Sequence, residues 1–165
     1  MLEKRTSFHH SVTELGNIQV RHVTEYFEEG VLVNRRYGQP YTPKDINDMA
    51  GFDVRSKLIV FTINTKEVRR EFKSETRLID RDHGLREFIT YDRVLNLDGK
   101  IAIRRITRIF DGKTEVSKRY HRTWIMPGDD FSGADVISKA LAVKFHTPET
   151  IAAYKKSLLS NLYPV

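Results

Sequence analysis

The residues of this chain best suited to chemistry lie in the stretch KRYHRTWIMPGDD, residues 118–130. His121 carries an imidazole, the side chain that acts most often as a general base. Asp129, Asp130 or Asp135 could orient that imidazole or hold a metal ion. Such a site needs its side chains within hydrogen-bond reach of one another, and the spacing of these residues does not impose that.

The same stretch also fits a structural role. Pro127-Gly128 is a turn signal, and Asp129 or Asp130 is suited to cap a helix that follows the turn. An earlier stretch with a related pattern has Gly38 at the position of His121. We therefore predict no catalytic residue here.

Signatures of metal and cofactor sites are also missing from the sequence. The chain has no cysteine, which excludes thiolate ligands and disulfides. His9 and His10 are adjacent, and on a strand they would point to opposite faces. Neither a glycine-rich phosphate loop nor a nucleophile elbow occurs. The sequence predicts a protein that is not an enzyme and has no cofactor and no metal.

Positive charge is concentrated in one segment. The formal net charge is +6, and the segment from Lys100 to Arg122 has eight Lys or Arg against two acids. A basic β-ribbon with aromatic side chains could lie along a phosphate backbone and stack on bases. The candidate interaction residues, for nucleic acid or for protein, are Arg104, Arg108, Lys118, His121, Arg122 and Trp124.

A hairpin is expected to position these residues, and a similar hairpin occurs earlier in the chain. The 20 residues from Ile18 align without a gap with those from Ile101, and seven positions are identical. Further matches follow in the same order: Asp53, Ser56 and Thr65 recur as Asp135, Ser138 and Thr147. Ordered self-similarity of this kind predicts two tandem related modules. The first hairpin has three Arg and three Glu, so the excess of positive charge is not repeated.

The periodicity within each copy predicts strands followed by helices. Residues 101–110 and 116–126 alternate in polarity around Asp111-Gly112, and the first copy turns at Glu28-Glu29-Gly30. Residues 133–145 have a helical period. The sequence Thr147-Pro148-Glu149 begins a further helix, whose stripe of Ile151, Tyr154, Leu158 and Leu159 should dock on the body.

Two features of the first copy are less clear from the sequence. The run LIVFTI, residues 58–63, fits a strand as well as a helix. Thr42-Pro43-Lys44-Asp45 marks a break like that at Pro127. We predict an α+β fold with a first hairpin and helix module at 1–75, a connector with a turn at 76–89, and a second module at 90–165.

The sequence also predicts where the protein resides. The first ten residues are charged and lack the apolar run of a secretory signal. Apolar runs are far shorter than the roughly 20 residues that a membrane span requires. We therefore expect a soluble protein that is not exported by this route and does not bind membranes.

The second copy resembles a group of short uncharacterised bacteriophage and prophage proteins. The shared features are an arginine-rich hairpin, Tyr-His-Arg at 120–122, Pro-Gly-Asp-Asp at 127–130 and a helix start at Thr147-Pro148-Glu149, within residues 99–156. The first copy departs from this pattern, with Tyr-Gly-Gln at 37–39. The resemblance implies a phage origin and no known activity.

Together, these features predict a non-enzymatic virion protein of the tail, neck or baseplate, assembled in the host cytoplasm. It would act as a structural or adaptor component, as a homo-oligomer in contact with other virion or tail proteins. The alternative is a basic nucleic-acid-binding protein that uses the hairpin at 100–122.

Overall fold

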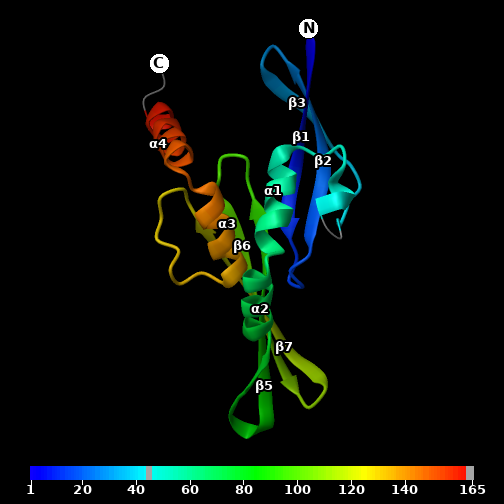
Figure 1. Ribbon diagram of the computed structural model, residues 1–165, viewed down its shortest axis with the longest axis vertical. Coiled ribbons are helices and arrows are strands. Elements are labelled where there is room, and N and C mark those ends of the chain that lie inside the picture. The colour runs from blue at the N-terminus through cyan, green and yellow to red at the C-terminus, as the bar shows by residue number, and fades with distance from the viewer. Residues whose placement is uncertain (44–45, 163–165) are drawn as a thin grey trace.

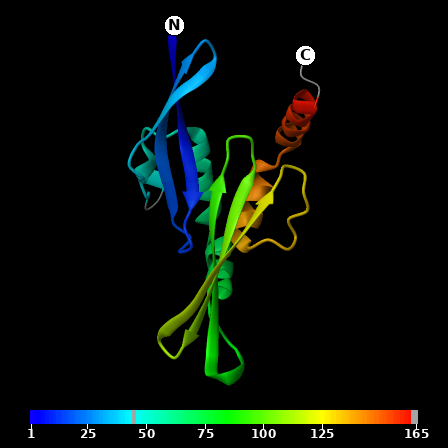
Figure 2. The ribbon, with the colours of Figure 1, turned by 180° about the vertical axis from the view of Figure 1, so that it is seen from behind.

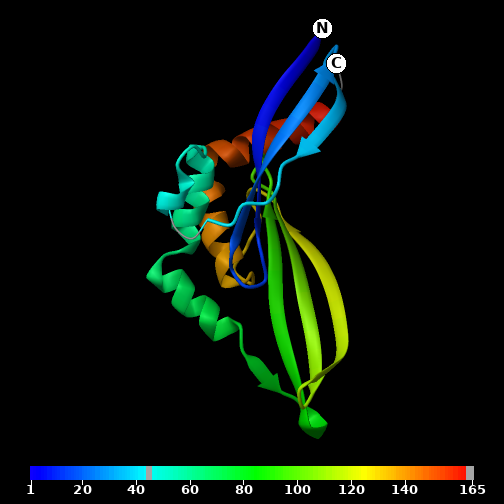
Figure 3. The same ribbon diagram turned by 90° about the vertical axis from the view of Figure 1, so that its right-hand side faces the viewer.

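The chain forms one curled antiparallel sheet with helices on one of its faces (Figures 1 and 3). This computed structural model describes residues 1–43 and 46–162. The strands are β1 (Leu2–Val12), β2 (Ile18–Glu28), β3 (Val31–Tyr37), β4 (Leu78–Asp80), β5 (Leu85–Leu95), β6 (Ile101–Asp111) and β7 (Thr114–Ile125). The predicted α+β class is confirmed.

Helices follow each set of three long strands. After β3 come a 3₁₀ turn and two helices, and after β7 come two more helices; a short 3₁₀ turn precedes β5. These elements are η1 (Ile46–Met49), α1 (Val54–Ile63), α2 (Lys66–Glu75), η2 (Asp82–Gly84), α3 (Val136–Phe145) and α4 (Pro148–Leu162).

The sheet consists of two three-stranded meanders in the order β3-β2-β1-β5-β6-β7, and β4 pairs with the start of β5. Three residue pairs join the meanders: His10 with Leu95, Ser11 with Val94, and Val12 with Arg93. We call these pairs the seam. Beyond the seam the meanders separate, and their hairpins extend toward opposite ends of the molecule (Figure 2).

The first two strands of each meander match in length, and the register shifts match in position, although β3 has 7 residues and β7 has 12. β1 and β5 each have 11 residues, as do β2 and β6. The register shifts between Tyr26 and Phe27 on β2 and at the matching place, between Ile109 and Phe110, on β6. His10 of the first meander lines up with Arg93 of the second, and Val12 lines up with Leu95. The pair of His10 with Leu95 therefore corresponds to the pair of Val12 with Arg93. The three pairs of the seam are therefore arranged symmetrically about Ser11–Val94.

The hairpin turns lie where the sequence predicts them. The β2–β3 turn has positive φ at Glu29 (51°) and Gly30 (81°), and the β6–β7 turn has positive φ at Gly112 (58°). Glycine adopts this left-handed region without a steric cost, which is why Asp-Gly and Glu-Gly steps favour tight hairpins.

The run at 58–63 is helical and forms most of α1. Asp53 caps this helix by accepting the N–H of Ser56 at 2.8 Å. Ile59, Val60 and Ile63 are buried at helical spacing, so burial on one face outweighs the strand preference of these β-branched residues.

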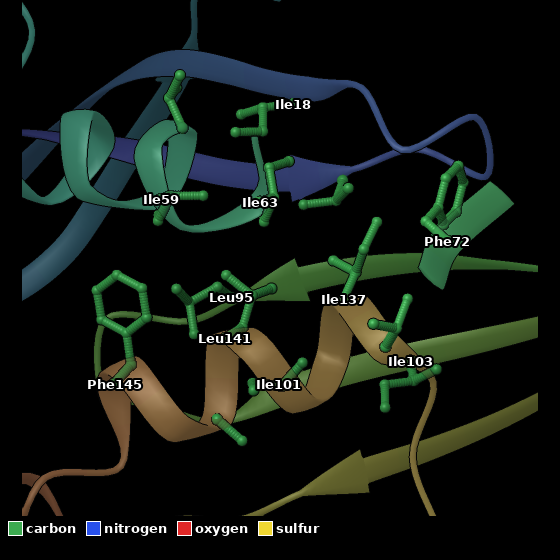
Figure 4. Packing of buried hydrophobic residues seen from close by; sticks show 14 of the residues in the cluster. Ile18, Ile59, Ile63, Phe72, Leu95, Ile101, Ile103, Ile137, Leu141 and Phe145 are labelled. Carbon is green, nitrogen blue, oxygen red and sulfur yellow. The ribbon is translucent and has the colours of Figure 1, made fainter. Parts of the chain in front are cut away.

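The core lies between the helices and the inner face of the sheet, which we define as the face carrying Val12, Leu95 and Ile101 (Figure 4). Complete burial of each large aliphatic side chain stabilises the fold by about 1.5–3 kcal/mol. Both halves of the chain contribute to this single cluster. Its labelled members are Ile18, Ile59, Ile63, Phe72, Leu95, Ile101, Ile103, Ile137, Leu141 and Phe145.

Polar side chains occupy equivalent places on the inner face. In the first meander, buried His10 lies 2.7 Å from the hydroxyl of Ser56 on α1. In the second, Arg93 donates to Asp135 (Nε–Oδ1 2.9 Å), which also caps Ser138 on α3. Each meander is therefore tied to its own first helix by a buried polar contact.

Two local predictions require correction. Asp129 and Asp130 do not cap a helix: Asp129 accepts the N–H of Met126, and Asp130 accepts that of Ser132. These bonds are satisfied within the loop because α3 begins later, at Val136, and Asp135 caps it.

The second correction concerns α4. The helix begins at Pro148 as predicted, with Thr147 accepting the N–H of Thr150. However, Leu158 is 44% exposed and Leu159 is 59% exposed. The predicted apolar stripe does not dock along its whole length, because the second half of α4 extends away from the body (Figure 1).

The predicted connector, 76–89, contains β4, η2 and the first residues of β5. The predicted turn at Asp82-His83-Gly84 is present, with positive φ at His83 (61°) and Gly84 (73°). In the break predicted at 42–45, Lys44 and Asp45 lie outside the described residues.

Candidate interaction surface

The register of the β6–β7 hairpin places five of the six predicted residues on one side of the sheet. Arg104 pairs with Arg122, Arg108 with Lys118, and Ala102 with Trp124. Paired residues and residues two apart share a face, so these side chains lie together. His121 pairs with Arg105 and therefore belongs to the other face.

We call the face with Arg104, Arg122 and Trp124 the outer face, because the helices cover the opposite one. Ile101 and Ile103, which alternate with Ala102 and Arg104, are buried in the core. Figure 2 shows the outer face of β5–β7 with the helices behind it.

Two aromatic side chains on the outer face are open to solvent. Tyr120 is 56% exposed and Trp124 is 51% exposed. The guanidinium of Arg104 lies 5.3 Å from the Tyr120 ring, and the ammonium of Lys118 lies 5.6 Å from it. These cation–π contacts hold Tyr120 between two positive charges.

Two of the predicted arginines are held by acids of the same chain. Arg104 forms an ion pair with Asp92 on β5, and this bond raises the pKa of Arg104. Arg108 bridges Glu14 in the β1–β2 turn (2.7 Å) and Glu115 (3.4 Å). The side chain of Arg108 is only 12% exposed, so it mainly joins the two meanders.

The Glu14 carboxylate lies over the outer face of the second meander. It accepts hydrogen bonds from Thr90 (2.8 Å) and Arg108 (3.0 Å). Partial burial raises the pKa of Glu14, but these hydrogen bonds outweigh burial and lower it. The carboxylate is therefore a charged clamp between the meanders.

A groove of about 510 Å³ lies on the outer face next to the seam. Arg104, Arg122 and Trp124 form one wall of the groove, and residues of β1, β2 and β5 form the rest of its lining. The polar side chains that the sequence alone did not identify are Ser11, Thr13, Gln19 and Asp92. They come from distant segments, and only the β1–β5 pairing brings them to the hairpin.

The acids near His121 in the sequence do not converge on it. Asp129 and Asp130 bond to their own loop, and Asp135 is buried against Arg93. His121 is exposed on the side of β7 opposite Arg122 and Trp124.

His9 and His10 lie on opposite faces, as predicted from their adjacency: His10 is buried, and His9 lies 6.3 Å from the ring of Tyr37. Within 1–43 and 46–162, no three His, Asp or Glu side chains are grouped so that they could hold a metal ion. In the same ranges no helix has the length and apolar character to cross a membrane.

Comparison with protein-family models, with curated protein sequences and with solved structures found no match to this chain.

Proposed function

We propose that this protein is a non-enzymatic structural or adaptor component of a bacteriophage particle, in the tail, neck or baseplate, acting as an oligomer through protein–protein contacts. One observation carries the proposal: the molecule ends in two hairpins, and among the described residues each outer strand, β3 or β7, pairs with a strand on one side only. All seven residues of β3 are exposed, as is β7 except for Ser117 and Ile125. Unpaired strand edges are the usual sites where sheets add a strand from another chain.

Each hairpin also presents an apolar side chain at its register shift. The pairing skips Val33 on β3 and Val116 on β7, so these valines are the extra residues of the two bulges. They are 52% and 56% exposed. Exposed valines at equivalent places on opposite ends suit a subunit that meets two similar partners.

We further propose that the two halves arose by duplication, with the second copy starting at Leu85. The support is the shared order of three strands and two helices, the shared bulge position, and the matching caps at Asp53 and Asp135. The phage setting is proposed from the resemblance of residues 99–156 alone, and with it a location in the virion after assembly in the host cytoplasm.

The assembly proposal is tested by native mass spectrometry of the wild type and of a Val33→Lys/Val116→Lys variant. We expect the wild type to form an oligomer and the variant to shift toward monomer, because a buried lysine opposes association. Val143→Lys is the matched control, since Val143 is also exposed, at 72%, but lies on α3 and not on an outer strand. A monomeric wild type that is also absent from purified particles contradicts the proposal.

A second candidate function, binding of single-stranded nucleic acid, is favoured by the row of Tyr120, Arg122 and Trp124 on the outer face. Aromatic rings and cations alternating along an exposed strand can stack on bases and neutralise phosphates. Lys118 extends the row toward the hairpin tip.

This candidate is tested by fluorescence anisotropy with a labelled single-stranded oligonucleotide at several salt concentrations. A Lys118→Gln/Arg122→Gln variant should bind more weakly and show a shallower salt dependence. Arg35→Gln/Gln39→Ala provides a control at the equivalent positions of the first half. No binding by the wild type at low salt eliminates this function.

A further inference from the structure

The groove on the outer face follows one row of paired residues that crosses five strands. Successive pairs connect Gln19 of β2, Ser11 of β1, Val94 of β5, Ala102 of β6 and Trp124 of β7. The three middle side chains are short, whereas a glutamine and a tryptophan stand at the two ends. All five residues line the groove, and its volume of about 510 Å³ is typical of a ligand pocket.

A second row beside the first carries the charges of the groove. Asp92, Arg104 and Arg122 pair across β5, β6 and β7, two residues along each strand from the first row. Asp92 binds Arg104, and Arg93, which also lines the groove, binds Asp135. Among the residues that the structure describes, no carboxylate lies within ion-pair distance of Arg122. The groove therefore has one uncompensated positive charge, at Arg122.

The indole of Trp124 is not used in packing against another ring. Within the described part of the chain it makes no hydrogen bond and no aromatic contact, and it is 51% exposed. Tyr41, its match in the sequence of the first copy, instead pairs with Val20 and stacks on Phe52 at 5.4 Å. Trp124 therefore offers the groove a ring face on which a ligand can pack.

The polar side chains of the groove require a ligand that donates as well as accepts hydrogen bonds. Asp92 binds Arg104 through Oδ2 only, so its Oδ1 is an acceptor without a partner among the described residues. Ser11 and Gln19 add a hydroxyl and a carboxamide. A phosphodiester has only acceptors and would bring negative charge beside Asp92, whereas a sugar hydroxyl both donates and accepts.

We propose that this groove binds an acidic oligosaccharide. A sugar ring packs on Trp124, and a sugar carboxylate pairs with Arg122, whose guanidinium matches a carboxylate in geometry. Hydroxyl groups bond to Asp92, Ser11 and Gln19. The row spans four strand spacings, about 19 Å, which suits a short chain of sugars better than a single ring. This inference goes beyond the proposed assembly role and does not rest on it.

Trp124 is the only tryptophan of the chain, so its intrinsic fluorescence reports directly on the groove. The wild-type protein is titrated with two acidic probes, sialyllactose and trigalacturonic acid, and with lactose as the neutral counterpart of sialyllactose. We expect a saturable change in emission with at least one acidic probe. Lactose should bind about tenfold more weakly than sialyllactose, because it lacks the carboxylate that pairs with Arg122.

A pair of charge variants tests the role of Arg122. Arg122→Gln should bind the acidic probe no better than the neutral one. Lys118→Gln is the matched control, because it removes a positive charge from the same face of β7 but outside the groove, and it should keep the preference. Both side chains are exposed, so circular dichroism should show an unchanged fold. Gln19→Ala, across the seam, should weaken binding severalfold without changing the charge.

Three outcomes would overturn the inference. The first is an unchanged emission with both acidic probes at millimolar concentration. The second is an equal loss of binding in Lys118→Gln and Arg122→Gln, which would indicate general attraction to positive charge. The third is tighter binding of a single-stranded oligonucleotide with the same Trp124 response, which would assign the groove to nucleic acid. A monomer by native mass spectrometry would contradict only the assembly proposal.

Discussion

Arg93 is the most deeply buried charged residue of the sheet. Its side chain and that of Asp135 are 0% and 1% exposed. The guanidinium donates to Asp135 and to the carbonyl of Tyr91 at 2.7 Å, while Asp135 also accepts from Ser138. Because both charges have their hydrogen bonds satisfied, the pair can be buried; removing one partner leaves the other unpaired in the core.

We expect Arg93→Met to lower the free energy of unfolding by about 3–5 kcal/mol, as for other broken buried pairs. Arg104→Met is the matched control, because its ion pair with Asp92 is 44% and 25% exposed and should contribute less than about 1 kcal/mol. Urea unfolding of both variants measures the difference, and equal losses would contradict the argument.

The equivalent position in the first meander predicts a pH dependence. Burial lowers the pKa of His10 to about 4, with Asp53 partly opposing this shift and Arg55 adding to it. As the pH falls, His10 is therefore protonated at a higher pH in the unfolded chain than in the folded one. Stability is retained above the unfolded pKa of about 6.5 and is lost as the pH falls toward about 4, by about 3 kcal/mol.

A His10→Gln variant should lack this component. Its free energy of unfolding, measured at pH 7 and at pH 4, should change less than that of the wild type between the two. The difference between the two proteins isolates His10 from other titrating groups. If both lose the same stability, His10 does not control the acid sensitivity.

Alternation along residues 116–126 places Tyr120, Arg122 and Trp124 on one face of their strand, because residues two apart on a strand share a face. It could not identify Asp92 or Gln19 as part of the groove, since those positions depend on how two meanders join. In the sequence, Asp53 and Asp135 appear only as matching residues of the two copies and not as helix caps. Asp129 and Asp130, which the sequence predicted as helix caps, do not have that role.

At the scale of elements, local signals located most strands and turns. The strands of both hairpins follow from alternation and from the glycines at 30 and 112. The run at 58–63 could not be assigned, because its residues favour strands locally and only the packing against α3 and the sheet makes a helix the better choice.

The β5–β6 turn gives a prediction at this scale. Gly99 has a φ of 87°, and an added Cβ would lie 2.7 Å from a methyl carbon of Thr150 on α4. Gly99→Ala should therefore destabilise the protein by about 1–2 kcal/mol from the backbone and by a further 1–3 kcal/mol from overpacking.

Gly112→Ala provides the comparison for Gly99→Ala. Gly112 also has positive φ, at 58°, but apart from its two chain neighbours no described residue has an atom within 4 Å of its added Cβ. Thermal unfolding should show the larger loss for Gly99→Ala. Equal losses would mean that the contact between the turn and α4 does not matter for stability.

The whole molecule is built on a core that neither half completes alone. Ile59 and Ile63 of α1 pack with Ile137 and Leu141 of α3 in one cluster (Figure 4). The sequence predicted two related modules but not this shared core. The antiparallel seam and the helix contacts connect residues far apart in the chain, and no local pattern encodes them.

A shared core predicts that cutting the link between the halves leaves them together. Leu78, Ile79 and their neighbours from Arg77 to Gly84 are exposed. Brief trypsin treatment should cleave there, after Arg77 or Arg81. The two fragments should still elute as one species from a sizing column and unfold in one transition. Separate elution would show that each half is an independent domain.

The seam also determines how the molecule carries mechanical load. The two hairpins of the molecule extend to opposite ends, so a pull on their tips is directed along β1 and β5, the strands that form the seam (Figure 2). The backbone bonds of the three pairs are then stretched in shear and resist together, rather than opening one after another. Bending at the seam is opposed by contacts outside it: α1 and α2 pack on α3 over the inner face, and Glu14 binds Arg108 over the outer face. A pull along the molecule therefore loads the seam, whereas a bend loads the helices and the Glu14–Arg108 pair.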